Sequence, residues 1–196
     1  MKKIITISRQ FGAGGGTIGE ILAKRLGFDY IDKELVFRTA RDTNLTPEEI
    51  AAIDEKVPSV FGFAQSLFDM YNAPLDERLF SAQKKIIQKI AEKGNCVIVG
   101  RNSNFILREY DNALHALIYA NVDWRVEYLK KEKMQGSSEA KIREYVRDVD
   151  KARRKYCQYY TKSEFTLTES YDICLCTSRL GIEKCADILC ALASER

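Results

Sequence analysis

The sequence predicts an α/β fold in which a parallel sheet carries helices on both faces. Two observations support this. Short β-branched or apolar segments alternate with longer segments of helical periodicity along the 196 residues. A run of glycines, Gly12-Ala13-Gly14-Gly15-Gly16, also separates the first strand-like segment from the first helical one. The length suits one large domain, so we expect a single domain over residues 1–196.

Five segments have the composition of strands. The first is β-branched, with Ile4, Ile5, Thr6 and Ile7 in succession, and a short apolar run, Cys96-Val97-Ile98-Val99, reads as a buried strand. The expected strands cover residues 3–7, 28–31, 96–99, 113–120 and 171–175.

Helical periodicity fills most of the remaining chain. After the glycines, Ile18, Ile21, Leu22 and Leu26 repeat at helical spacing, and Gly27 ends the helix. Residues 32–93 are nearly all helical in pattern. Thr46, Pro47 and Glu49 predict a helix start with a capping box in that stretch. A helix is expected to end near Gly94, and others are expected after an Asp123 cap, over residues 138–160 and over residues 182–192.

Composition excludes several classes of protein. The net charge of +3 is too weak to indicate nucleic-acid binding. No signal peptide is visible, and no apolar run approaches the roughly 20 residues of a membrane helix. The six cysteines are expected to be reduced structural thiols, which predicts a cytoplasmic location. The one histidine, His115, is expected to be buried and hydrogen-bonded, so no metal cluster or catalytic triad is built on it.

The glycine run has the features of a phosphate-binding loop. Glycines let the backbone turn tightly with its N–H groups pointing inward, and the following helix adds its positive N-terminal dipole. A loop between a strand and an amphipathic helix is the context that such a motif requires. The alternative is a tight strand-to-helix turn without a ligand, which four glycines in five residues disfavour.

The segment from Ile5 to Thr17 resembles the Walker A loop of nucleoside monophosphate kinases, and of cytidylate kinases most closely. Two departures stand out: Gly15 replaces the phosphate-binding lysine, and Arg9 replaces the first Walker glycine. Three outcomes are open. Arg9 supplies the missing cation, another lysine or arginine does so, or catalysis is lost while binding survives. The whole chain resembles the cytidylate-kinase-like branch, which carries a Gly-Gly pair in place of that lysine.

The resemblance implies a three-layer P-loop NTPase fold with a five-stranded parallel sheet of order 2-3-1-4-5. The core would cover residues 1–31, 94–137 and 168–196, with a helical acceptor-binding insert over about 32–93 and a helical lid over about 138–167. Donor phosphates would bind the loop, and Thr17 would hold Mg²⁺ through water. The implied phosphate-binding residues are Gly12, Ala13, Gly14, Gly15, Gly16 and Thr17.

Three further matches imply an acceptor site and a lid. Asp32 with Arg38 is similar to an acceptor-binding pair, and Gly100-Arg101 is similar to the family's Gly-Arg-Asp, with Asn102 in place of the aspartate. Asp150 and Arg153 match the lid. Taken alone, Arg38 and the lid arginines also suit a solvated helix face, whereas Arg101 follows a buried strand, where α/β sheets bind ligands. The implied catalytic residues are Arg9, Arg101 and Arg153, and the implied acceptor-binding residues are Asp32, Arg38, Arg101 and Asp150.

These matches imply ATP- and Mg²⁺-dependent phosphoryl transfer to a nucleoside monophosphate or similar small acceptor, with no nucleic-acid or membrane partner. The alternative is a nucleotide- or phosphate-binding regulator that has lost catalysis together with its lysine.

Overall fold

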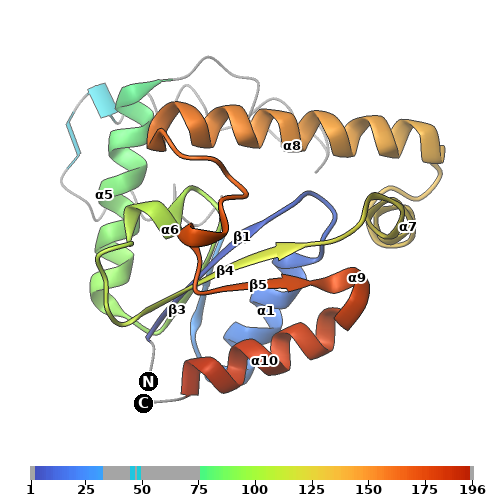
Figure 1. Cartoon of the computed structure of the whole chain (residues 1–196). Coiled ribbons are helices and arrows are strands. Elements are labelled where there is room, and N and C mark those ends of the chain that lie inside the picture. Colours follow the sequence, from blue (N-terminus) through green and yellow to red (C-terminus); the bar gives the residue numbers. More distant parts are fainter. Residues whose placement is uncertain (1–2, 33–44, 47, 50–75, 195–196) are drawn as a thin grey trace.

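The computed structural model describes residues 3–32, 45–46, 48–49 and 76–194. Within these residues, five parallel strands form one sheet of order β2-β3-β1-β4-β5, which confirms the expected order (Figure 1). The strands are β1 (Ile4–Arg9), β2 (Asp29–Ile31), β3 (Cys96–Val99), β4 (Ala113–Tyr119) and β5 (Ile173–Cys176).

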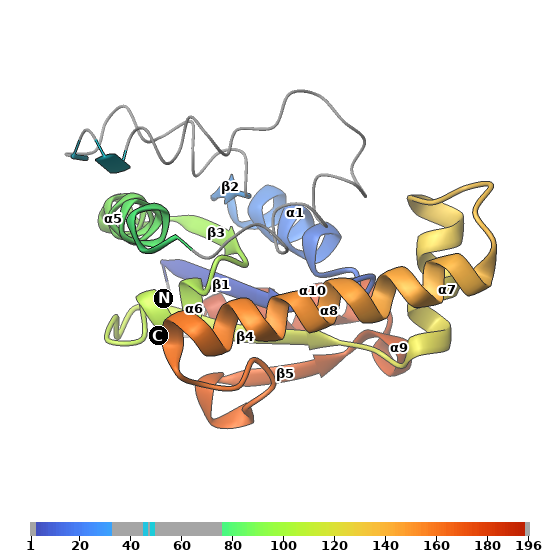
Figure 2. The ribbon, with the colours of Figure 1, turned by 90° about the horizontal axis from the view of Figure 1, so that it is seen from above.

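Helices cover both faces of the sheet, so the expected three layers are present (Figure 2). Ile5 and Ile7 of β1 point to one face, where they pack against α1 (Gly15–Leu26) and α10 (Ile182–Ser194). Ile4 points to the other face, toward α5 (Glu77–Lys93) and α6 (Ser103–Ile106). Burial on both faces explains why the strands are continuously apolar in sequence.

One helix begins where the sequence predicts, and another has a different N-cap residue from the one expected. Ser138 caps α8 (Glu139–Thr161), because its hydroxyl accepts a hydrogen bond from the N–H of Lys141 at 3.3 Å. The cap of α7 (Val122–Glu132) is Asn121, whose Oδ1 accepts from the N–H of Trp124 at 2.9 Å. The expectation of Asp123 as the cap was wrong, since the chain is already helical at Val122. The short helix α9 (Thr177–Leu180) was not anticipated.

The predicted capping box is confirmed in the described part of the insert. The N–H of Thr46 donates to Glu49 Oε2 at 2.9 Å, and the N–H of Glu49 donates to Thr46 Oγ1 at 3.3 Å. Lys85 Nζ and Ser81 Oγ of α5 then donate to the same carboxylate at 2.9 and 2.7 Å. Most of the expected insert, including Arg38, lies outside the described residues.

The structure also bears on the expectations for the cysteines, the histidine and membrane-spanning helices. The six cysteines are free thiols. His115 is half-buried, and its Nδ1 lies 2.7 Å from Thr6 Oγ1, so it is hydrogen-bonded as expected. Among the described residues, no helix has the length and apolar character needed to span a bilayer.

A buried ionic contact fixes the α7–α8 hairpin to the loop after β1. Phe11 of that loop packs between the two helices, and its N–H donates to Asp150 Oδ1 at 2.8 Å. Arg125 Nη1 donates to Asp150 Oδ2 at 2.5 Å and to the carbonyl of Phe11 at 3.1 Å. Both charged side chains are more than nine-tenths buried. One carboxylate therefore holds two helices and the loop together.

We expect Asp150→Ala to lower the free energy of unfolding by about 3–5 kcal/mol, because it leaves Arg125 as an uncompensated buried charge. It also removes the acceptor for the N–H of Phe11. Urea unfolding of both proteins measures the difference. Asp148→Ala, at an exposed acidic position of the same helix, is the matched control and should stay within about 0.5 kcal/mol of the wild type. Equal losses in the two variants would contradict the assignment.

Candidate active site

The glycine loop, residues 9–17, connects β1 to α1 and needs glycine at two positions for its shape. Gly12 and Gly14 have φ values of 77° and 79°, in the left-handed region. A Cβ at Gly12 would lie 2.7 Å from Leu129 Cδ1 and 3.2 Å from the carbonyl oxygen of Arg125. Gly14 is the N-cap of α1, so the first N–H groups of a twelve-residue helix face the loop. The loop thus has the features of an anion-binding backbone.

Hydrogen bonds to surrounding elements hold the loop in place. Thr177 Oγ1, at the start of α9, donates to the carbonyl of Ala13 at 2.9 Å. Gln10 Oε1 accepts from the N–H of Ala120 at 3.1 Å. Together with Asp150 and Arg125, these bonds fix successive residues of the loop before any ligand arrives. Such preorganisation lowers the cost of aligning dipoles on a charged ligand.

A cavity of about 300 Å³ opens over the loop. This volume is at the lower end of the range for small-molecule sites. Cationic and acidic side chains face it from different directions. Its charged lining residues are Arg9, Lys133, Arg153, Glu20 and Asp32, and its remaining lining comes mainly from the glycine loop, Tyr30, Val99, Tyr128 and Leu129.

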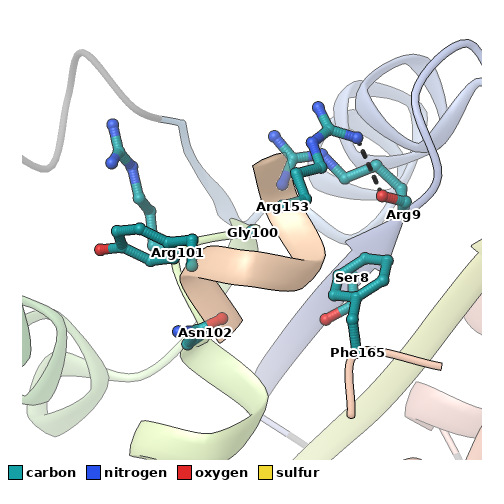
Figure 3. Close-up of a pocket in the computed structure, with 8 residues that line it drawn as sticks. Ser8, Arg9, Gly100, Arg101, Asn102, Arg153 and Phe165 are labelled. Atoms are coloured by element: carbon teal, nitrogen blue, oxygen red, sulfur yellow. Dashed lines mark hydrogen bonds between the residues drawn. The ribbon is translucent and has the colours of Figure 1, made fainter. Parts of the chain in front are cut away.

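Arg153 of α8 is buried at the wall of this cavity. Its Nη1 donates to the carbonyl of Arg9 at 2.9 Å, and its guanidinium carbon lies 5.6 Å from the centre of the Phe11 ring. Figure 3 shows this hydrogen bond as a dashed line between the guanidinium of Arg153 and the backbone of Arg9. The predicted lid arginine therefore already contacts the loop.

Arg101 lies in an unusual turn that follows β3. Gly100, Arg101 and Asn102 have consecutive positive φ values of 81°, 64° and 53°. For residues other than glycine this conformation is strained, and such strain is concentrated at functional sites. Gln83 of α5 stabilises the turn, because its Nε2 donates to the carbonyl of Arg101 at 3.1 Å and to Tyr156 Oη at 3.2 Å.

The turn borders a second, smaller cavity of about 10 Å³, which Arg9 and Arg153 also line (Figure 3). In that view the guanidinium of Arg101 extends away from the Arg9–Arg153 pair. The side chain of Asn102 is largely buried, and its Nδ2 has no hydrogen-bond partner. The strained turn therefore brings a third arginine, Arg101, to the wall of the small cavity that Arg9 and Arg153 also line.

Oxygen donors suited to Mg²⁺ face the larger cavity. Thr17, in the first turn of α1, lies with its Oγ1 2.9 Å from Tyr128 Oη, and the carboxylates of Glu20 and Asp32 line the same space. Mg²⁺ prefers such oxygen ligands and retains several waters, so this donor set fits the ion.

Burial, together with Glu20 and Asp32, raises the pKa of Tyr30 to about 12, and Arg9 opposes the rise.

The structure gathers most of the predicted site residues, but Ala13, which is fully buried, and Asp150 line neither cavity, and Arg38 is not described. Arg9, Arg153, Thr17, Asp32 and the glycines of the loop line one cavity, while Arg101 lines the adjoining one. Asp150 lines neither, because both of its oxygens accept hydrogen bonds from loop and helix groups instead of facing an acceptor. Arg38 lies outside the described residues.

Sequence reasoning did not find five residues that build the site. They are Glu20, Gln83, Arg125, Tyr128 and Lys133. Four of them sit in a helix, or just after one, among many similar polar residues, so no local signal distinguishes them. Gln83 had a usable signal, because it is a polar residue on the apolar face that Leu79 and Ile86 define.

Comparison with known proteins agrees with this geometry. A relative, the cytidylate kinase of Archaeoglobus fulgidus, is 29% identical over 159 residues, covering 80% of this chain and 76% of that protein. A crystal structure of an uncharacterized Eubacterium ventriosum protein has a TM-score of 0.75 at 24% identity, covering 98% of this chain and 99% of that one.

A shikimate kinase of Bacteroides thetaiotaomicron shares the fold with a TM-score of 0.57 at 15% identity, covering 98% of both chains. The sequence profile of the cytidylate kinase-like family matches residues 4–179, nearly the whole length. On the strength of this match, the chain belongs to the cytidylate kinase-like family.

Proposed function

We propose that this protein transfers a phosphoryl group from ATP to a nucleoside monophosphate or a similar small phosphorylated acceptor. One observation carries the proposal: a glycine loop held by buried hydrogen bonds forms part of a cavity that the side chains of Arg9 and Arg153 also line, with Arg153 bonded to the loop at the carbonyl of Arg9. Phosphoryl transfer needs this arrangement, because it depends on positioning and on neutralising charge more than on covalent chemistry by the protein.

Each part of the site has a role in this proposal. The N–H groups of the loop and of the first turn of α1 hold the donor phosphates. Thr17 would hold Mg²⁺ through water, with Glu20 as a further oxygen donor at the cavity, and the ion would add positive charge to the site. Arg153 neutralises the charge that builds on the transferred group, in a buried setting where its effect is strongest.

We place the acceptor-binding part of the site at the strained turn after β3. Arg101 projects away from the loop arginines and its backbone carbonyl accepts a hydrogen bond from Gln83, so we place its guanidinium on the acceptor side of the site (Figure 3). A planar guanidinium binds a phosphate through two parallel hydrogen bonds. Asp32, and Arg38 by the sequence match, would complete the acceptor site. The relative named as a cytidylate kinase supports a nucleoside monophosphate as the acceptor class.

A screen of acceptors tests the reaction directly. The purified chain is incubated with ATP and Mg²⁺ and each of the nucleoside monophosphates and other phosphorylated or hydroxylated small molecules, and ADP formation is measured. We expect ADP above the acceptor-free rate for at least one acceptor. Tight ATP binding without turnover for any acceptor would contradict phosphoryl transfer and favour the regulatory alternative.

For Arg153→Ala we expect kcat to fall by about a hundred- to a thousandfold, the usual effect of removing one donor to a charged transition state. ATP affinity should fall much less, since the loop backbone remains. Steady-state kinetics and equilibrium binding separate the two effects. Arg154→Ala removes a neighbouring exposed cation and should leave kcat near the wild-type value. A kcat loss that is equal in both variants would exclude a specific role for Arg153.

For Arg101→Met we expect a rise of at least about tenfold in the KM of the acceptor, because one charge-assisted hydrogen-bonded contact is lost. The KM of ATP should not change, since Arg101 extends away from the loop. Methionine keeps a long side chain with the same backbone strain that arginine tolerates there. A rise in the KM of ATP instead would place Arg101 on the donor.

A further inference from the structure

The side chain of Arg9 lies across two glycines that are 85 positions apart in the sequence, Gly15 and Gly100. A Cβ built on Gly15 would be 2.6 Å from Arg9 Cβ and 3.0 Å from its Cγ. A Cβ built on Gly100 would be 1.7 Å from Arg9 Nη1 and 2.7 Å from its Cζ. The aliphatic part of Arg9 therefore rests on the start of α1, and its guanidinium rests on the end of β3.

These distances make positions 9 and 15 mutually exclusive for side chains. The atom nearest to a Cβ on Gly15 is the Cβ of Arg9, which is bonded to the backbone and cannot rotate aside. The backbone of Gly15 is helical, so its need for glycine is steric and not conformational. A lysine at position 15 would displace either the stem of Arg9 or the strand that carries it.

The arginine is also held in place by its neighbours. Arg153 Nη1 donates to its carbonyl at 2.9 Å, and Gln10, the next residue, is tied to β4 by the N–H of Ala120. Arg9 lines both cavities together with Arg153. Two guanidinium groups that line one cavity can both donate hydrogen bonds to the oxygens of one polyphosphate.

We infer that Arg9 takes over the work of the Walker lysine, contacting the terminal phosphates of the nucleotide from the strand side of the loop. The inference rests on the proposed function and adds to it a catalytic residue and a reciprocal exchange. Where cytidylate kinases have glycine at position 9 and lysine at position 15, this chain has arginine and glycine. Only one of the two positions has room for a side chain. Arginine suits the task because its charge is fixed and its planar fork matches phosphate oxygens.

Exchanging the two residues tests the inference. The variants are Arg9→Gly, Gly15→Lys and the double variant Arg9→Gly/Gly15→Lys, with Arg147→Ala as a control for the loss of an exposed cation. Binding of ATP with Mg²⁺ is followed by the fluorescence of Trp124. This residue is the chain's sole tryptophan, and its ring comes within 4.0 Å of a Cβ built on Gly14. Turnover is measured with an acceptor from the screen.

We expect Arg9→Gly to lower turnover by about a hundred- to a thousandfold and to weaken ATP binding by about tenfold or more. Gly15→Lys alone should also lower both, because the added side chain collides with Arg9. The double variant should exceed both single variants and recover to within about tenfold of the wild type, since a lysine then has both the space and the position. Thermal unfolding of each variant shows whether the fold survives.

The variant Arg9→Lys keeps the positive charge but lacks the planar guanidinium group, and it should retain more activity than Arg9→Gly. Wild-type turnover and ATP affinity in Arg9→Gly would overturn the inference, as would higher activity in Gly15→Lys alone.

These measurements distinguish a failure of the proposed function from a failure of the inference about Arg9. A wild type that binds ATP without turnover would refute transfer, while the pattern of ATP affinities across the variants still decides the place of Arg9. A wild type that binds no ATP would overturn both.

Discussion

The close approach of the end of β1 to the start of α1 is the constraint on which the site depends. It leaves room for one side chain between positions 9 and 15, and here that side chain is Arg9. The parallel sheet brings the end of β3 beside it, so Gly100 must also lack a side chain. The cation at the phosphate loop is thus determined by backbone geometry in three segments and not by the loop sequence alone.

Helix α8 connects this cation to the rest of the molecule. Arg153 holds the carbonyl of Arg9, and Asp150, one turn earlier on the same helix, holds the N–H of Phe11 and the guanidinium of Arg125. The segment expected to act as a lid therefore has a buried anchor at the loop. Charged groups fixed in this way need little reorganisation when a charged ligand arrives, which is the condition for strong electrostatic stabilisation.

The sequence predicted the fold well because the evidence for it is local and repeated. Strand and helix periodicity predicted the parallel sheet with helices on both faces, and the family resemblance implied the sheet order. The site was predicted in part: Arg9, Thr17 and Arg153 meet at one cavity, as expected from matched motifs. The role of Asp150 was not predicted, because its partners Phe11 and Arg125 are distant in sequence. The contact of Arg9 with the two glycines could not be predicted either, because a glycine in the sequence does not indicate which side chain packs against it.

The central claim is that Arg9 occupies the place of the missing lysine, and a crystal structure with a non-hydrolysable ATP analogue and Mg²⁺ tests it most directly. The claim predicts that the Arg9 guanidinium lies within about 2.7–3.1 Å of oxygens of the terminal phosphates, with its stem still across Gly15. A bound nucleotide whose terminal phosphates contact a different cation, with Arg9 turned away from them, would contradict it.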